Sequence, residues 1–326
     1  MPVELLFSFI AVILGFVVVM KAADWFVQGA GATARNLGVS TMVIGLTVVG
    51  LGTSAPEIMI SVIATLDGNS GLAVGNALGS NITNIALVLG VTALVVPLVV
   101  RSETLRREYP VMFLIMLVSL MLVADGVLDI IDGVVLLIGV VLMLWWLVML
   151  GKRRGYDPME AEYASEIPYM PTRRALVWLV IGLVLLLSSS RALVWGAVNI
   201  AHYYGVSDLI IGLTIVALGT SLPEMAASIM GALRKEPDIA IGNVIGSNMF
   251  NLLVVLGIPG LLGPVQLDAE VLTRDYPVMI GLSVALFVMA YGFRGDGRVN
   301  RIEGGLLLLA YFAYLGLLYY AITGQA

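Results

Sequence analysis

The chain has 326 residues, of which 60% are hydrophobic and only 12% are charged, and its formal net charge at pH 7 is −5. This composition is typical of polytopic membrane proteins and leaves no sizeable soluble domain, and we expect no nucleic-acid partner. The absence of cysteine excludes disulfides, zinc–thiolate sites and thiol catalysis, and the single histidine, His202, cannot form a histidine-based metal site.

A helical membrane span needs about 20 mostly apolar residues, and the sequence holds ten such stretches. They lie at about 4–24, 40–66, 71–98, 108–124, 129–151, 175–200, 207–233, 238–263, 275–293 and 302–322. The N-terminus lacks the basic region of a cleaved signal peptide, so we expect the first stretch to remain as a transmembrane helix. Residues 152–174 form the one long connection, which we interpret as a cytoplasmic linker.

The second half of the chain repeats the first at a constant offset of 167 residues. The matching runs are Gly52-Thr53-Ser54-Ala55-Pro56-Glu57 with Gly219-Thr220-Ser221-Leu222-Pro223-Glu224, Gly75-Asn76 with Gly242-Asn243, Gly79-Ser80-Asn81 with Gly246-Ser247-Asn248, and Tyr109-Pro110-Val111-Met112 with Tyr276-Pro277-Val278-Met279. Because the offset does not drift, we interpret the chain as an internal duplication. The sequence therefore predicts one five-helix repeat at 1–151 and a second at 175–326.

Each repeat holds an odd number of spans, so the second must enter the membrane from the opposite side, as is usual in secondary transporters. With both termini outside, fourteen of the 17 Lys and Arg residues fall on inner connections and only Arg274 falls on an outer one. We therefore predict an all-α polytopic membrane protein. It would have ten transmembrane helices in two inverted five-helix repeats, with broken second and third helices in each repeat.

Proline in the first repeated motif predicts a helix break in the middle of a span. Pro56 has no N–H and its ring clashes with the carbonyl of Gly52, while Ala55 is pushed away from helical dihedrals. We expect nearby carbonyls, including that of Gly50, to be freed, and Glu57 to begin the next half-helix, where the helix dipole favours a negative charge. Such a break survives in a membrane only where it faces protein or a wet cavity.

The repeated polar positions offer oxygen ligands only. They are the carboxylates of Glu57 and Glu224 and the hydroxyl and amide groups of Thr53, Ser54, Ser80, Asn84, Thr220, Ser221, Ser247 and Asn251. Hard cations such as Ca²⁺ and Na⁺ prefer such ligands, and a glutamate in the middle of a span costs at least about 2.5 kcal/mol, which favours a functional role. Two carboxylates balance one divalent ion or a load of monovalent ions, but not both loads, and such exclusive occupancy is the physical basis of exchange.

Other charged residues in the spans have structural interpretations. Asp24 aligns with Arg191 across the repeat, and we interpret these two and Lys21 as ion-paired or snorkelling side chains near span ends. Asp129 and Asp132 lie at a helix start, where capping explains them.

The motifs Gly-Thr-Ser-x-Pro-Glu and Gly-Asn-x-x-Gly-Ser-Asn resemble the α-repeats of the sodium/calcium exchanger family, within the cation/Ca²⁺ exchanger superfamily, in its compact prokaryotic type. The resemblance covers nearly the whole chain. It implies four central cation sites lined by the second and third helices of each half, with Glu57 and Glu224 as principal ligands shared by Ca²⁺ and Na⁺. The neutral oxygens named above would join them, and the backbone carbonyls of Gly50 and Ala217 would contribute to Na⁺ sites.

One position departs from the family pattern. Some relatives carry Asp where this chain has Asn251, and the other repeat also has an asparagine, Asn84. The site thereby loses one possible negative charge or proton acceptor, which leaves the coupling ion and its stoichiometry open.

We predict a secondary active antiporter in a prokaryotic inner (plasma) membrane that expels Ca²⁺ against entering Na⁺ by alternating access. The alternatives are a Ca²⁺/H⁺ or other divalent-cation/H⁺ antiporter, then a cation channel, then a membrane enzyme, for which the sequence shows no nucleophile with its base. The predicted partners are Ca²⁺, Na⁺ and the lipid bilayer. We expect no cofactor and no obligatory protein partner.

Overall fold

The computed structural model describes residues 3–100, 107–153, 170–205, 217–291 and 297–323. The first half contains α1 (Val3–Leu37), α2 (Thr41–Ile44), the π-helical turn η1 (Gly45–Val49), α3 (Gly50–Thr53), α4 (Ala55–Leu66), α5 (Ser70–Thr83), the π-helical turn η2 (Asn84–Val88), α6 (Leu89–Val95), β1 (Leu98–Val99), α8 (Glu108–Leu122), β2 (Val127–Leu128) and α9 (Ile130–Arg153). The second half contains α11 (Thr172–Tyr203), α13 (Ala217–Thr220), α14 (Leu222–Leu233), α15 (Pro237–Phe250), η4 (Asn251–Val255), α16 (Gly257–Leu262), β3 (Val265–Gln266), η5 (Val271–Asp275), α17 (Tyr276–Ala290), β4 (Arg298–Val299) and α18 (Arg301–Thr323).

The element bounds reproduce the offset found in the sequence. Helices α3, α4 and α5 and the turn η2 recur, residue for residue, as α13, α14, α15 and η4. The correspondence extends to the turns, because Gly68 and its counterpart Lys235 both have a positive φ, 78° and 60°. Lys235 is the only non-glycine residue with a positive φ in the described part of the chain, so the duplicated backbone overrides the usual steric preference there.

Seven of the described helices are long and apolar enough to cross a membrane, and an eighth span is formed if Thr41–Thr53 and Ala55–Leu66 are counted as one bent helix. Two shorter apolar helices, α8 and α14, fall within the fourth and seventh predicted stretches. The first part of that seventh stretch and most of the predicted linker lie outside the described residues.

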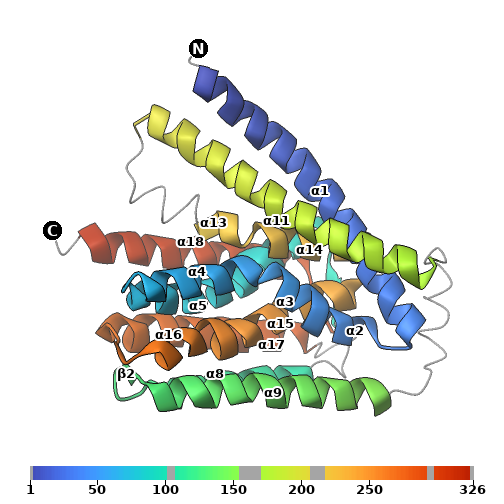
Figure 1. The fold of residues 1–326 in the computed structure, drawn as a ribbon. Helices are drawn as coiled ribbons and strands as arrows, with labels where there is room; N and C mark the ends of the chain where they lie inside the picture. The colour runs from blue at the N-terminus through green and yellow to red at the C-terminus, as the bar shows by residue number, and fades with distance from the viewer. Residues whose placement is uncertain (1–2, 101–106, 154–169, 206–216, 292–296, 324–326) are drawn as a thin grey trace.

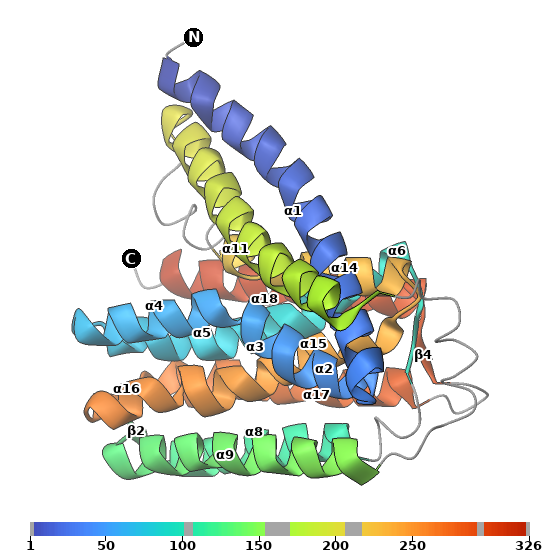
Figure 2. The same ribbon diagram turned by 45° about the vertical axis from the view of Figure 1, so that its right-hand side comes forward.

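Two long helices cross the rest of the molecule at an angle. Figures 1 and 2 show α1 and α11 lying against each other, while most other long helices run roughly side by side in a separate layer. The pair is antiparallel and very close, because Gly29 packs on the backbone of Leu179 and Gly182 on the backbone of Phe26. A β-carbon at Gly182 would lie 2.5 Å from the Phe26 nitrogen, so the two backbones meet without room for side chains.

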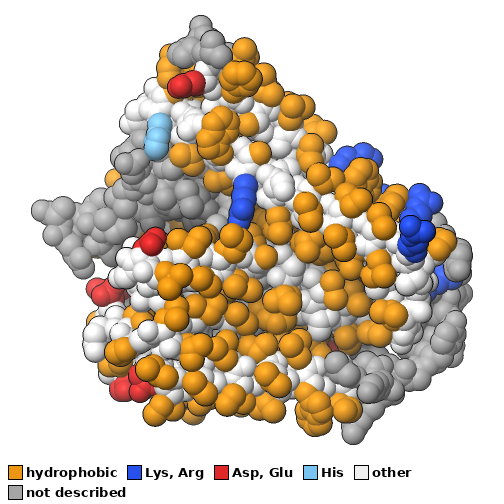
Figure 3. Space-filling view, viewed as in Figure 1, with side chains coloured by type: hydrophobic (Ala, Val, Ile, Leu, Met, Phe, Trp, Pro, Cys, Tyr) orange, Lys and Arg blue, Asp and Glu red, His pale blue; other side chains and the backbone are white. Residues whose placement is uncertain are grey.

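Short antiparallel strands join the two halves. β1 pairs with β4, and β2 pairs with β3, so each two-stranded sheet takes one strand from each half. Hydrophobic side chains cover much of the layered face in Figure 3, whereas acidic side chains gather at one end of its helices and basic side chains near the other. This distribution suits helices that cross a lipid bilayer with opposite charge at their two ends.

Two details differ from the sequence predictions. α1 extends to Leu37 rather than ending near residue 24, because its buried polar residue Asp24 is ion-paired. The third helices are not broken, since Ser70–Val95 and Pro237–Leu262 are each continuous through a π-helical turn. Residues 70–95 contain no proline, so the backbone absorbs the irregularity without losing its hydrogen bonds.

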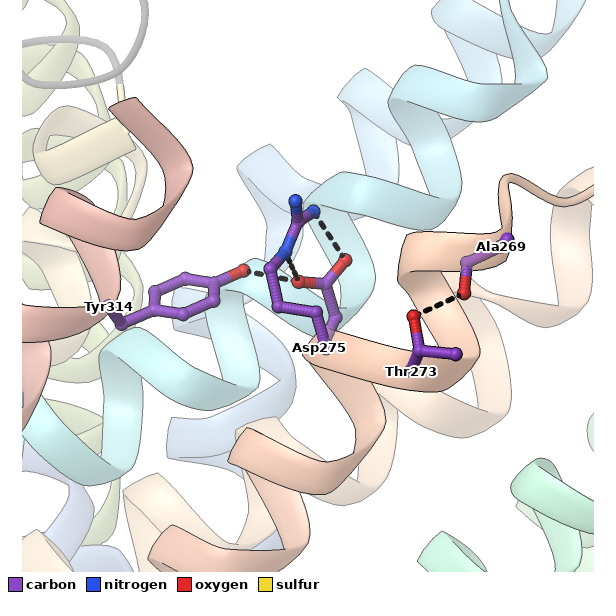
Figure 4. A network of polar contacts seen from close by, with 5 residues as sticks. Ala269, Thr273, Asp275 and Tyr314 are labelled. Atoms are coloured by element: carbon purple, nitrogen blue, oxygen red, sulfur yellow. Dashed lines mark hydrogen bonds and ion pairs between the residues drawn. The ribbon is translucent and has the colours of Figure 1, made fainter. Parts of the chain in front are cut away.

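The predicted helix cap is found at the start of α9, and a buried polar group lies at the start of α17. Asp129 accepts from the Ile131 and Asp132 nitrogens at 2.8 and 3.0 Å, as expected of a helix cap. Figure 4 shows Asp275 beside the Tyr314 hydroxyl, which lies 3.0 Å from its carboxylate, and Arg274 donates to the same carboxylate at 2.7 Å. The aspartate is only 7% exposed. The group therefore ties the start of α17 to α18.

Candidate cation-binding site

The site is built around the predicted helix break. α3 ends at Thr53, Ser54 has φ −77° and ψ 4°, and α4 begins at Ala55 with Pro56 in its first turn. The two segments of this span are bent by 43°. The break thus falls at Ser54 and not at Ala55, because proline is readily accepted in the first turn of a new helix.

The same break recurs between α13 and α14. Ser221 has φ −88° and ψ 4°, and Pro223 lies in the first turn of α14. Glu57 and Glu224 consequently occupy the first turns of α4 and α14, where unpaired backbone N–H groups and the helix dipole favour negative charge.

The two glutamates are buried and face a shared region. Each is only 1% exposed, and their carboxyl groups lie close enough to interact electrostatically. The Ser54 hydroxyl donates to the Glu224 Oε1 at 3.3 Å, which connects the break of the first half to the carboxylate of the second. Two buried carboxylates near each other are unfavourable unless a positive charge balances them.

Hydroxyl groups of the first break contact α15. Thr53 donates to the Asn243 Oδ1 at 2.9 Å and lies 3.4 Å from the Ser247 Oγ. The Gly50 carbonyl, which we expected to be freed, accepts from the Ser247 hydroxyl at 3.3 Å and from the Ser54 nitrogen at 3.1 Å. The bend is too small to separate that carbonyl from the next turn, so this expectation is wrong for Gly50.

Four asparagine side chains form two hydrogen bonds between the halves, and the repeat offset relates one bond to the other. Asn84 donates to the Asn248 Oδ1 at 3.1 Å, and Asn251 donates to the Asn81 Oδ1, also at 3.1 Å. The π-helical turns η2 and η4 begin at Asn84 and Asn251. Such turns often occur at functional sites, and here they present the amides to the opposite half.

A second pair of asparagines donates hydrogen bonds to the backbone of the two glutamates. Asn76 donates to the backbone oxygen of Glu57 at 3.2 Å, and Asn243 donates to that of Glu224 at 3.1 Å. Our candidate ligands did not include these two residues or Asn81 and Asn248. All four belong to the repeated Gly-Asn-x-x-Gly-Ser-Asn motif, so the repeat itself was the signal that identifies them.

Several buried oxygens at this site have no hydrogen-bond partner in the described structure. They are the Oε2 atoms of Glu57 and Glu224, the Oδ1 atoms of Asn84 and Asn251, and the Oγ of Ser221. A buried polar atom without a partner costs roughly 1–3 kcal/mol, and all five atoms can act as acceptors. Oxygens of this kind suit a hard cation, which would satisfy them together.

The remaining candidate ligands lie around this centre. Ser80 is buried one turn before Asn84, and Ala217 is the first residue of α13. Thr220 is half-buried and lines a cleft of about 320 Å³. No group of three or more His, Cys, Asp or Glu side chains able to hold a metal ion occurs in the described part of the chain, so the charge here comes from two carboxylates.

A model of the family described as sodium/calcium exchanger protein matches residues 7–151 and 174–320. The chain is 49% identical to the putative antiporter CaxA of Alkalimonas amylolytica over 317 residues, which covers 97% of this chain and 99% of that protein. It is 40% identical to the inner membrane protein YrbG of Escherichia coli K12, over 94% of this chain and 95% of that one.

The fold is also similar to solved structures of the sodium-calcium exchanger NCX_Mj. A form of that exchanger soaked with zero Na⁺ and Ca²⁺ superposes with a TM-score of 0.82 and 32% identity, over 96% of this chain and 99% of the other. Fold and site together define an all-α polytopic membrane transporter rather than an enzyme. The chain belongs to the sodium/calcium exchanger family, and it is an antiporter of the cation/Ca²⁺ exchanger group.

Proposed function

We propose that this protein exchanges Na⁺ for Ca²⁺ and expels Ca²⁺ as Na⁺ enters. The observation that carries the proposal is the pair of buried glutamates, Glu57 and Glu224, whose Oε2 atoms have no hydrogen-bond partner in the described structure. Surrounded by neutral oxygens, two negative charges suit one Ca²⁺ or a load of Na⁺. Because the same carboxylates would serve both ions, binding of one excludes the other, as antiport requires.

The proposed ligands are the glutamates and the neutral oxygens that the two helix breaks and π-helical turns bring together. The neutral set is Thr53, Ser54, Ser80, Asn84 and their counterparts Thr220, Ser221, Ser247 and Asn251, with the carbonyls of Gly50 and Ala217. The Gly50 carbonyl would have to exchange one of its hydrogen bonds for an ion. If three Na⁺ enter for each Ca²⁺, one net charge moves per cycle, worth about 2.3 kcal/mol per 100 mV.

We further propose ten transmembrane helices in two inverted repeats, in a prokaryotic inner membrane with both termini outside. The Lys and Arg distribution and the name of the E. coli relative, an inner membrane protein, support this placement. Under this topology, the C-terminal ends of α4 and α14 lie at opposite faces of the membrane.

A Ca²⁺/H⁺ or other divalent-cation/H⁺ antiporter is the second candidate function. Asn84 and Asn251 are both amides, so the described site has only two carboxyl groups to carry protons or balance Na⁺. The relative CaxA is named a putative antiporter, and that name does not specify a coupling ion.

The test uses purified protein in proteoliposomes loaded with Ca²⁺. An inward Na⁺ gradient should drive ⁴⁵Ca²⁺ efflux, with a rate that depends on membrane potential, whereas an equal choline gradient should not. Efflux driven by a pH gradient and unaffected by Na⁺ would support the second candidate instead. Efflux that needs no counter-ion would contradict both and indicate a channel.

A further inference from the structure

We propose that two ion pairs with exchanged charges, Asp24–Arg234 and Arg191–Asp67, alternately hold the α1–α11 pair at its two positions during transport. This role rests on the proposed antiport function. It assigns positioning residues to the transport cycle that lie outside the cation-binding site.

The first pair is formed in the structure. The Arg234 guanidinium contacts the Asp24 Oδ1 at 2.5 Å through Nη2 and at 2.6 Å through Nε, and Gln28 donates to the same oxygen at 2.9 Å. Asp24 lies in the middle of α1 and is only 8% exposed, whereas Arg234 directly follows α14. A carboxylate inside a span is costly, so the arginine fixes where α1 rests on α14.

The repeat supplies a second pair with the charges exchanged. At the offset of 167 residues, Asp24 corresponds to Arg191 and Arg234 corresponds to Asp67. This pair is not formed: Arg191 places its Nη2 3.2 Å from the Met59 sulfur, and no ion pair of Asp67 is found among the described residues. A duplication that keeps two complementary pairs while reversing both signs is difficult to explain by packing alone.

In the second pair, Arg191 contacts α4 at a distance from Asp67 along the helix. Asp67 directly follows α4 and lies eight residues after Met59, which corresponds to about 12 Å along the helix axis. Arg191 therefore contacts α4 two turns short of Asp67, whereas Asp24 already meets Arg234. The α1–α11 pair thus rests at unequal heights on the two halves.

Movement of the α1–α11 pair would exchange the two contacts. Its helices meet backbone to backbone at Gly29 and Gly182, so they are suited to move as one body. A shift that carries Arg191 toward the end of α4 pulls Asp24 away from the end of α14, because these ends face opposite membrane surfaces in the proposed topology. The side chains of Met59, Ile63 and Trp195 line an apolar cleft beside Arg191. These apolar side chains would offer no polar contact to oppose that shift.

The natural absence of cysteine makes the test direct, since each introduced pair of thiols is the only pair in the protein. The double variants D24C/R234C and D67C/R191C are oxidised in proteoliposomes, and cross-linking is measured by mass spectrometry before and after reduction. Both should cross-link, and each disulfide should stop exchange until it is reduced. Cross-linking of D67C/R191C requires a conformation other than the one described here.

The coupling between the pairs is tested by adding R234Q to D67C/R191C. Loss of the first ion pair should raise the cross-linking rate about two- to fivefold, as expected for a partly exposed pair. K21Q is the matched control, because Lys21 lines the same hollow as Asp24 and Arg234 and carries the same charge. It should leave the rate unchanged, whereas an equal effect of K21Q and R234Q would overturn the proposal.

A charge-swapped variant separates positioning from folding. D24R/R234D should recover most of the exchange rate that either single change loses. Absence of D67C/R191C cross-linking in folded protein would overturn the proposal even where Na⁺ drives Ca²⁺ efflux. Cross-linking does not depend on which ion is coupled, so it can succeed even if the proposed Na⁺/Ca²⁺ exchange fails.

Discussion

The two repeats carry the same polar residues in different surroundings. Asn243 of the second repeat is buried, donates to the backbone oxygen of Glu224 and accepts a hydrogen bond from Thr53 at 2.9 Å. Its counterpart Asn76 is half-buried and donates to the backbone oxygen of Glu57 at 3.2 Å. Equal residues therefore do not imply equal packing.

The glycines show the same inequality. Gly246 packs directly on the backbone of Leu46, whereas a β-carbon at its counterpart Gly79 would meet no atom within 4 Å among the described residues. Gly246 is accordingly buried and Gly79 half-buried, while Leu213, which corresponds to Leu46, lies outside the described residues. The duplicated motif thus lies in two different environments within one structure.

The largest effect is expected at the carboxylates, which the two halves share equally. Glu57→Gln and Glu224→Gln should each lower Na⁺-driven Ca²⁺ flux by about 100-fold or more, because one negative charge no longer balances a divalent ion. Flux in proteoliposomes measures the loss, and thermal unfolding verifies the fold. Glu4→Gln, at an exposed position, is the control and should keep full flux. Near-normal exchange in either site variant would refute the assignment.

The amides test whether the halves contribute equally to charge. Asn251→Asp adds a third carboxyl group beside the glutamates, and exchange should become several-fold slower at acidic pH, where that group takes up a proton. Asn84→Asp should do the same if the two repeats are equivalent at this position. The pH dependence of the flux, compared with that of the exposed control Asn69→Asp, measures the effect. A pH profile that matches the unaltered protein would argue against ion contact by these amides.

The different burial of Gly246 and Gly79 can be tested through stability. Gly246→Ala should lower the free energy of unfolding by about 1–3 kcal/mol, because its methyl group meets the Leu46 backbone. Gly79→Ala should leave stability unchanged or raise it by about 0.5–1 kcal/mol, since alanine stabilises a helix where space allows. Thermal unfolding in detergent measures both changes. Equal destabilisation by the two variants would contradict the inequality between the halves.

The smallest difference is expected between the supporting asparagines. Asn243→Ala removes hydrogen bonds to Glu224, Ser228 and Thr53 in a buried place and should cost about 1–3 kcal/mol. Asn76→Ala removes its bond to the Glu57 backbone in a half-buried place and should cost about 1 kcal/mol or less. A larger loss of stability in Asn76→Ala would contradict the expectation that the more deeply buried asparagine contributes more.

Local sequence features predicted much of the site. Pro56 and Pro223 predicted the helix breaks because proline acts on its own turn, and the structure shows a break at both places. Glu57 and Glu224 were identifiable because a carboxylate in an apolar span has few structural explanations. The errors were also local: a polar motif without proline was taken for a break, although Ser70–Val95 remains one continuous span.

Contacts between distant segments could not be predicted in this way. The ion pair of Asp24 with Arg234 joins residues 210 positions apart, and the cross-link of Asn84 with Asn248 joins residues 164 positions apart. Each side chain has several possible partners in the sequence. Which partner is used depends on which helices pack together and on how far they are shifted along their axes.

By itself, the sequence determined the membrane character of the protein, its duplication, its helix breaks and the types of oxygen available for a cation. These follow from hydropathy, an offset and the geometry of proline, all of which act within a few residues or along one chain. Only the tertiary structure decided which member of each repeated residue pair is more deeply buried, which amides cross-link and which of the two exchanged ion pairs is formed. The reason is physical: the repeats share their motifs, so these differences depend on contacts between segments that are far apart in the chain.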